Sequence, residues 1–148
     1  MLITGFLCSF SLGLLIGWWL FSDSRPRQLI KIRSSQTSSR EELLGLMASI
    51  GVQKLTLLIP EIILETDKTI VFKHPRQKYR KHYIFAPKKD IKDVGDFSED
   101  DKEYLIDLFA AIVTVINQEN LQNYRLWSNG PGKQDVTYLH FHLAEKIT

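Results

Sequence analysis

The stretch Val136-Thr-Tyr-Leu-His-Phe-His-Leu143 decides the interpretation of this chain, because its apolar and polar residues alternate. A period of two is typical of a β-strand, in which successive side chains point to opposite faces of a sheet. One face then carries apolar side chains and the other polar ones, namely Leu139, Phe141 and Leu143 against Tyr138, His140 and His142. We expect the apolar face to lie in a core. Neighbouring residues on one face are about 6.6 to 7 Å apart along a strand, which is close enough for the two imidazoles to engage one phosphate group.

The segments upstream of this strand predict a mixed fold. Apolar residues recur at helical spacing over residues 40–50 and 98–120. Gly51 would end the first helix, and Ser98 would cap the second. Short apolar, β-branched runs predict strands at residues 55–59, 62–64, 70–72, 82–86, 124–128 and 136–143, the last two joined by a turn at 129–132. Strands, one long helix and a final hairpin indicate an α+β fold with an antiparallel sheet.

The composition limits the number of domains and the kinds of partner. With 148 residues, 44% of them hydrophobic, the chain is long enough for one domain with a packed core and a short extra segment. The net charge of +2, with both signs mixed along the sequence, indicates no specific nucleic-acid-binding surface. A single cysteine, Cys8, excludes a disulfide framework or a cysteine-based zinc site within one chain.

The N-terminal residues predict a membrane anchor. Residues 2–21 carry no charge, and a helix of about 20 apolar residues can cross a bilayer. Trp18 and Trp19 stand near its end, and lysines and arginines follow but do not precede it, which by the positive-inside rule places the remainder in the cytoplasm. We therefore expect a single-pass membrane protein with an anchor at residues 1–22, a juxtamembrane linker at 23–39 and one domain at 40–148.

Two alternatives to an anchor remain for the apolar run. Ser22 and Ser24 would suit the cleavage site of a secretory signal, although such a signal normally carries positive charge before its apolar stretch. The other alternative is a buried core helix. A helix that is hydrophobic all round, however, needs a larger protein to cover it.

The four histidines of the chain fall into two short segments. His140 and His142 lie on the last predicted strand, and His74 and His82 flank one hairpin-like segment. A polar strand face exposed to solvent is the simplest interpretation, and a shared binding site is the alternative. Histidines at i and i+2 of a strand could also share a metal ion, but no spacing identifies a third ligand, so we predict no metal and no cofactor.

The last strand resembles the signature of the histidine triad (HIT) proteins, His-φ-His-φ-His-φ-φ, in which φ is apolar and Tyr138 stands at the first histidine position. Several upstream and neighbouring segments resemble the nucleoside-phosphoramidase (Hint) branch at matching spacing: Ile59-Pro60, Glu65-Thr66-Asp67, Val71-Phe72-Lys73-His74, His82, Ala86-Pro87-Lys88-Lys89, Tyr124-Arg125, Asn129 and Gln134. The resemblance covers roughly residues 55–143. It implies a HIT-like fold, an antiparallel sheet with one long helix.

The resemblance also implies a role for each matching residue. His140 corresponds to the central histidine, a nucleophile that attacks the α-phosphorus of a nucleotide, and His142 to the last histidine, which holds phosphate oxygens. His74 matches an additional histidine of the site, and Asp67 matches the acidic residue that binds the ribose. The remaining residues of the implied nucleotide site are Asn129, Gln134 and Tyr138. A neutral imidazole is a competent nucleophile near pH 7, which agrees with this assignment.

The resulting functional prediction is a nucleotide-binding HIT-like hydrolase or transferase that acts at the α-phosphate of a purine nucleotide. The resemblance further implies a homodimer that pairs through the long helix. Two departures leave an alternative open, because Tyr138, with a pKa of about 10, carries no positive charge at neutral pH, and Asp135 places a carboxylate beside the phosphate position. The alternative is a catalytically weak nucleotide-binding or structural HIT-like module in a membrane complex.

Overall fold

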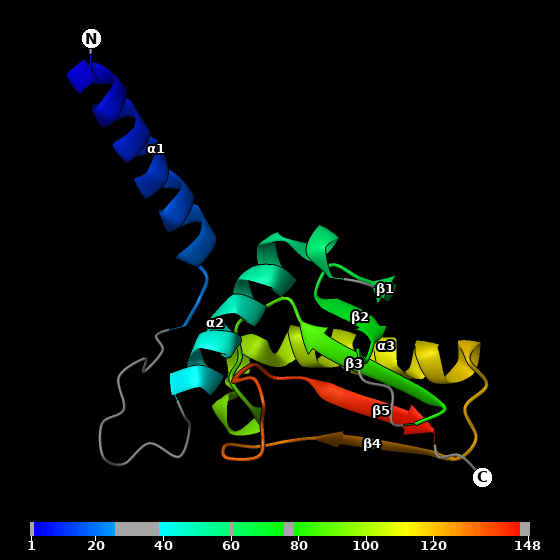
Figure 1. The fold of residues 1–148 in the computed structure, drawn as a ribbon. Helices are drawn as coiled ribbons and strands as arrows, with labels where there is room; N and C mark the ends of the chain where they lie inside the picture. The colour runs from blue at the N-terminus through cyan, green and yellow to red at the C-terminus, as the bar shows by residue number, and fades with distance from the viewer. Residues whose placement is uncertain (1, 26–38, 60, 76–78, 146–148) are drawn as a thin grey trace.

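The structure is a computed structural model that describes residues 2–25, 39–59, 61–75 and 79–145. The helices of this part are α1 (Leu2–Phe21), α2 (Ser39–Lys54) and α3 (Lys102–Gln118), with short 3-10 turns η1 (Thr56–Leu58), η2 (Val94–Asp96) and η3 (Glu99–Asp101). The strands are β1 (Ile62–Glu65), β2 (Thr69–Lys73), β3 (Lys81–Pro87), β4 (Tyr124–Ser128) and β5 (Phe141–Glu145). Figure 1 shows one sheet with α3 behind it, α2 at one end and α1 projecting outward.

The strands form a single antiparallel sheet in the order β1-β2-β3-β5-β4. β5 therefore lies between β3 and β4, with His142 opposite Ile84 on one side and opposite Trp127 on the other. This arrangement, with one long helix, confirms the predicted α+β fold with an antiparallel sheet. Its consequence for function is that the histidine strand is flanked on both sides by side chains of neighbouring strands.

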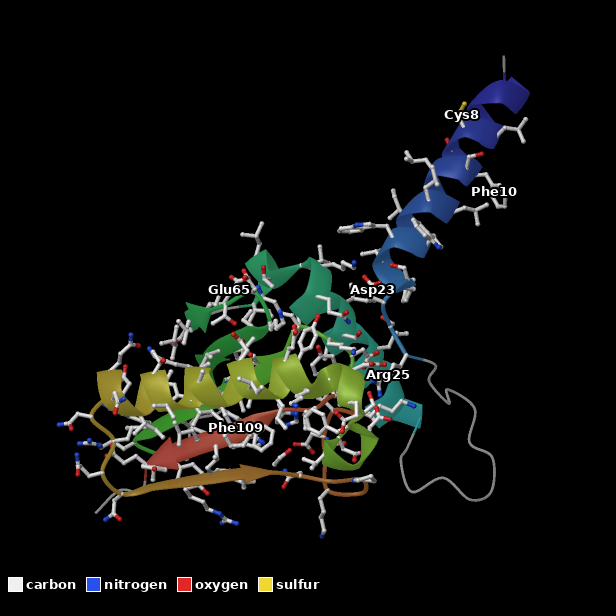
Figure 2. The ribbon with its side chains drawn as sticks, turned by 180° about the vertical axis from the view of Figure 1, so that it is seen from behind. Cys8, Phe10, Asp23, Arg25, Glu65 and Phe109 are labelled. Carbon is white, nitrogen blue, oxygen red and sulfur yellow. The ribbon has the colours of Figure 1, made fainter. Side chains whose placement is uncertain are left out.

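Helix α3 packs against one face of the sheet and forms the main core (Figures 1 and 2). The buried residues of this core come from α3, from Leu121 just after it, and from the alternate positions of the strands that face the helix: Val71, Tyr83, Phe85, Leu108, Ala111, Ile112, Val115, Leu121 and Leu143. The carboxylate of Asp101 accepts hydrogen bonds from the main-chain nitrogen of Ser98 at 2.8 Å and from its hydroxyl at 2.7 Å. Ser98 therefore caps the 3-10 turn η3, and α3 itself begins after this turn, at Lys102.

Helix α2 covers part of the opposite face, near β2. Val52 of α2 joins Ile70, Ala86 and Tyr138 in a second buried cluster. The close approach depends on Gly45, because a Cβ atom at this position would lie only 2.4 Å from the carbonyl oxygen of Thr137. The part of this sheet face that α2 does not cover carries His82 and His142.

Helix α1 forms where the apolar run predicts a helix, but it does not bear out the membrane anchor. Within residues 2–25, 39–59, 61–75 and 79–145, no helix has the length and apolarity needed to cross a bilayer. The prediction of a single-pass membrane protein with its domain facing the cytoplasm is therefore wrong.

The end of α1 and the residues after it contact the domain. Lys54 of α2 pairs with Asp23 and lies 5.6 Å from the centre of the Trp19 ring. The main-chain nitrogen of Arg25 donates to the buried carboxylate of Asp90 at 2.7 Å, and its guanidinium group pairs with Asp96. Figure 2 shows Arg25 at this junction. Most of the predicted linker, residues 23–39, lies outside the described residues.

Three segments differ from the sequence-based prediction. The apolar run 55–59 contains the 3-10 turn η1 rather than a strand, because a short apolar run does not distinguish the two by its periodicity. Helix α2 passes through Gly51 and ends at Lys54. β5 begins at Phe141, so Tyr138 and His140 precede the regular strand, and the main-chain nitrogen of Leu139 donates instead to the carbonyl of Ile91 at 2.6 Å.

Candidate active site

The candidate site lies on the face of the sheet opposite α3, where ring side chains from several strands meet. His82 of β3, His142 of β5 and Trp127 of β4 share this face, and His74 follows the end of β2. The ring of His142 lies 4.8 Å from that of Trp127, 5.2 Å from that of His82 and 5.8 Å from that of His74. The structure thus brings His74 and His142 together, as the sequence analysis expected of one shared site.

His140 is held next to this cluster by its own main chain. Its Nδ1 lies 2.7 Å from the carbonyl oxygen of Tyr138, and since a carbonyl can only accept, Nδ1 carries the proton. In the neutral ring the lone pair is then on Nε2. Burial lowers the pKa of His140 below its ordinary value of 6.5, against the opposing effects of this hydrogen bond and of the Asp135 carboxylate. The neutral, nucleophilic form therefore prevails near pH 7.

His142 is 8% exposed and lies between two aromatic neighbours. Its ring stacks on Trp127 with planes 12° apart, and its Nδ1 lies 3.1 Å from Nε2 of His82. Its centroid is 4.8 Å from that of His140, with the planes at 72°. Burial, together with the neighbouring histidines, lowers the pKa of His142 to about 3, so the ring is neutral at physiological pH.

His82 belongs to the cluster, although the sequence analysis assigned it no role. It is 5% exposed and stacks on His74 with centroids 4.2 Å apart and planes 5° apart. Burial and the proximity of His74 lower its pKa to about 4. The signal that could have found it is the predicted β2–β3 hairpin, since an antiparallel pairing of residues 70–72 with 82–86 brings His82 back beside His74.

The hydroxyl of Tyr138, at the first triad position, is engaged by main-chain carbonyls. The side chain is 2% exposed, and its hydroxyl lies within hydrogen-bond distance of two main-chain carbonyls, those of Pro87 and, at 3.0 Å, Lys89. These contacts tie the segment before β5 to the end of β3. The hydroxyl therefore hydrogen-bonds to the main chain, and we do not count it among the groups that could bind a phosphate.

The other predicted nucleotide contacts are spread along the site. Gln134 is 5% exposed and donates to the carbonyl of Lys92 at 3.0 Å. Asn129 is half-buried directly after Ser128, whose hydroxyl donates to the carbonyl of His140 at 2.8 Å. Asp67 is exposed in the β1–β2 turn, at the opposite end of β2 from His74, so the structure does not bring these two together.

Three histidines of the cluster are close enough together to be considered as ligands of a metal ion. Among the described residues, His74, His82 and His142 each offer a ring nitrogen, and these atoms lie within 4.8 Å of one another. A zinc ion would need imidazole nitrogens at about 2.0 to 2.1 Å, each binding through a lone pair in the plane of its ring. Because His74 and His82 stack with nearly parallel planes, no single point lies in both planes. The rings as they stand do not fit a shared ion.

A hollow of about 330 Å³ adjoins the cluster at His82. Its other lining residues are Lys73, Arg80, Lys81, Tyr83 and Glu119. Each of the three cations lies close to a carboxylate: Lys81 to Glu119 at 2.8 Å, Arg80 to Glu145 at 2.7 Å and Lys73 to Glu61 at 3.0 Å. The hollow is therefore lined by polar side chains, and the charge of each cation is balanced by a neighbouring carboxylate.

Comparison with known proteins agrees with this geometry. The profile of the family described as "Scavenger mRNA decapping enzyme C-term binding" matches residues 59–147, more than half of the chain. No curated protein sequence matches.

Solved structures of HIT proteins are similar to this chain. A HIT family hydrolase from Legionella pneumophila Philadelphia 1 is 26% identical with a TM-score of 0.59, over 66% of this chain and 91% of that one. A HIT family hydrolase from Clostridium thermocellum is 25% identical with a TM-score of 0.59, over 66% and 90%. A histidine triad nucleotide-binding protein from Candida albicans, 22% identical with a TM-score of 0.56 over 66% and 75%, shares the fold. The chain therefore belongs to the scavenger mRNA decapping enzyme C-terminal family, within the histidine triad superfamily.

Proposed function

We propose that this protein is a hydrolase or transferase that acts at the α-phosphate of a purine nucleotide, with His140 as the nucleophile. The observation that carries the proposal is the 2.7 Å contact between Nδ1 of His140 and the carbonyl of Tyr138, which leaves the Nε2 lone pair available. The identities of two similar structures as HIT family hydrolases support the reaction class. The name of a third, a histidine triad nucleotide-binding protein, supports the ligand class.

The reaction proceeds in two displacements at phosphorus. Nε2 of His140 bonds to the α-phosphorus while the bond to the leaving group breaks, and the leaving group keeps the electron pair and takes a proton from solvent. Water then attacks the same phosphorus, the bond to Nε2 breaks, and a nucleoside monophosphate and a proton are released. In a transferase, an alcohol or amine replaces the water. Each step is easier than a single direct displacement.

His142 is the proposed phosphate ligand, because its ring lies 4.8 Å from that of the nucleophile. His74, Asn129, Gln134 and Asp67 remain proposed nucleotide contacts. The first triad position is different, since the buried Tyr138 hydroxyl is engaged by carbonyls. We assign it to positioning the His140 segment. With no imidazolium at this position, the developing negative charge is stabilised mainly by neutral donors.

The decisive experiment measures AMP release from adenosine 5′-phosphoramidate by the full chain and by His140→Ala. We expect turnover by the wild type and only the background rate for the variant. A rapid quench should also trap one AMP covalently bound to the wild type and none on His140→Ala. Gln118→Ala, on the exposed side of α3, is the matched control and should retain activity. A cap dinucleotide belongs in the substrate panel because the family description refers to mRNA decapping.

Calorimetry with AMP separates this proposal from its alternative, a nucleotide-binding module with little turnover. Binding without AMP release or a covalent adduct would support the alternative. Absence of both binding and turnover with purine and pyrimidine nucleotides would remove the nucleotide assignment altogether.

We also propose that the protein pairs with a second copy through α3. Ile106, Phe109 and Val113 recur on one side of this helix and are 61%, 43% and 56% exposed. Burying this stripe against itself would remove apolar surface from water. Sedimentation should give a dimer that Ile106→Lys with Val113→Lys converts to a monomer, whereas Gln118→Lys leaves it dimeric. A monomeric wild type at tens of micromolar would contradict the pairing.

A further inference from the structure

The contact between His82 and His142 joins two neutral rings that are distant in the sequence. Nε2 of His82 and Nδ1 of His142 are 3.1 Å apart, and both side chains are buried. A hydrogen bond between two nitrogens uses one proton, so one ring donates and the other accepts. The two possible arrangements differ in what the remaining nitrogen of His142 offers to a ligand.

In the first arrangement His82 donates from Nε2. Nδ1 of His142 then accepts, and Nε2 of His142 carries a proton that can be donated to a phosphate oxygen. In the second arrangement His142 donates from Nδ1, and its Nε2 has a lone pair instead. A lone pair facing an anionic oxygen is repulsive, so the second arrangement would oppose phosphate binding.

Nδ1 of His82 distinguishes the two arrangements. This atom is buried, and no hydrogen-bond partner is found for it among the described residues. In the second arrangement it would carry a proton and become an orphaned buried N–H, which is rare in native proteins. In the first it is an unprotonated acceptor. The first arrangement also gives both rings the Nε2–H tautomer, which is intrinsically favoured for a histidine side chain.

Trp127 restrains the His142 ring in the orientation that this hydrogen bond needs. It stands opposite His142 in the β4–β5 register, and the two rings lie 4.8 Å apart with planes 12° apart. The guanidinium carbon of Arg125 lies 5.1 Å from the Trp127 ring, and the His82 ring is 5.7 Å from it. A tryptophan packed between these groups has little room to rotate, so the imidazole stacked on it is also restrained.

We propose that His82 and Trp127 are positioning residues that hold His142 as the neutral Nε2–H tautomer. The main-chain carbonyl of Tyr138 sets the opposite tautomer on His140, so the two imidazoles have complementary functions. One offers a lone pair to phosphorus, and the other offers a proton to a phosphate oxygen. The use of this proton for phosphate rests on the proposed function, whereas the tautomer itself does not.

The tautomer is tested without any ligand by ¹⁵N NMR of histidine-labelled, metal-free full-length protein at pH 7. For the wild type we expect the long-range pattern of an Nε2–H ring at residue 142. His82→Gln keeps an amide donor near the position of Nε2 and should retain that pattern, whereas His82→Leu removes the donor and should shift residue 142 toward a mixture of tautomers. An Nδ1–H ring in the wild type, or an unchanged ring in His82→Leu, would overturn the proposal.

The effect on ligand binding is measured with AMP by calorimetry. His82→Leu should raise the Kd about tenfold, as the loss of one oriented hydrogen bond predicts, and His82→Gln should recover most of the affinity. Trp127→Phe should retain the stack and Trp127→Ala should lose it, with thermal unfolding showing whether each variant is folded. Equal Kd values for folded His82→Leu and wild type would contradict the positioning role. If the wild type has the expected tautomer but binds no nucleotide, only the proposed function fails.

Discussion

Nδ1 of His140 lies 2.7 Å from the carbonyl oxygen of Tyr138, two residues earlier in the same chain. The contact requires no other side chain, because the bend before β5 turns this carbonyl toward the ring. A carbonyl oxygen oriented in this way fixes which ring nitrogen is protonated. The protonation state of the nucleophile then depends mainly on its burial, which determines the pH range in which the protein can act.

The first prediction concerns the pH dependence of turnover. Because burial lowers the pKa of His140 below 6.5, the unprotonated nucleophile persists at lower pH than in an exposed histidine. The acid limb of kcat/KM for adenosine 5′-phosphoramidate should therefore have its midpoint below 6.5. The exposed carboxylate of Asp135 acts in the opposite direction, so Asp135→Asn should move this midpoint to still lower pH. A midpoint that moves to higher pH in Asp135→Asn would contradict the assignment of His140 as the nucleophile.

The second prediction separates two roles for the hydroxyl of Tyr138. Tyr138→Phe leaves the carbonyls of Pro87 and Lys89 without this donor inside a buried cluster. The free energy of unfolding in urea should fall by about 1 to 3 kcal/mol. The Kd for AMP should change less than about threefold, because the hydroxyl is engaged by these two carbonyls. A large loss of affinity at unchanged stability would instead support the phosphate contact that the sequence analysis assigned to this residue.

The sequence predicted those parts of the molecule that depend on local periodicity. Residues 98–120 carry a helical repeat and a capping serine, and the observed α3 lies within them. The alternation around His140 also predicted that Leu143 faces the core and His142 the opposite side. Both properties depend on side-chain spacing along one element, and that spacing is present in the sequence itself.

Contacts between elements were harder to predict. The β2–β3 hairpin brings His82 beside His74, but its contact with His142 depends on the β3–β5 register, which no local pattern encodes. The hydrogen bond of the Tyr138 hydroxyl to the carbonyl of Pro87 depends on where the chain turns after β3. The predicted membrane anchor is also wrong, because no helix within the described residues has the length and apolarity needed to cross a bilayer. The two missed contacts, by contrast, depend on the surroundings of a segment rather than on its own sequence pattern.

The third prediction is a loss of stability on acidification. In the folded protein the pKa of His82 is about 4 and that of His142 about 3, both below the 6.5 of an unfolded histidine. Between pH 6.5 and about 4 the unfolded state therefore binds more protons, so stability decreases as the pH falls. From pH 7.5 to 5.5 these two rings together should lower the free energy of unfolding by at most about 2 to 3 kcal/mol, less where solvent screens them. His140, whose pKa is also lowered, adds to this drop.

Urea titrations at the two pH values measure this difference, and both lie above the range in which carboxylates titrate. His142→Asn removes one of these groups and should reduce the pH dependence by its contribution, about 1 kcal/mol. A free energy of unfolding that is the same at pH 7.5 and 5.5 would mean that these rings accept protons in the folded state.

The fourth prediction compares two glycines of α2. At Gly45 an added Cβ would lie 2.4 Å from the carbonyl oxygen of Thr137, a main-chain atom that cannot move without displacing the segment before His140. At Gly51 an added Cβ would have no atom within 4 Å. Gly45→Ala should therefore destabilise the protein and weaken AMP binding, whereas Gly51→Ala should stabilise it by about 0.5 to 1 kcal/mol through the higher helix propensity of alanine. Thermal unfolding and calorimetry on the pair check this, and a Gly45→Ala protein as stable as Gly51→Ala would show that α2 does not pack closely against the His140 segment.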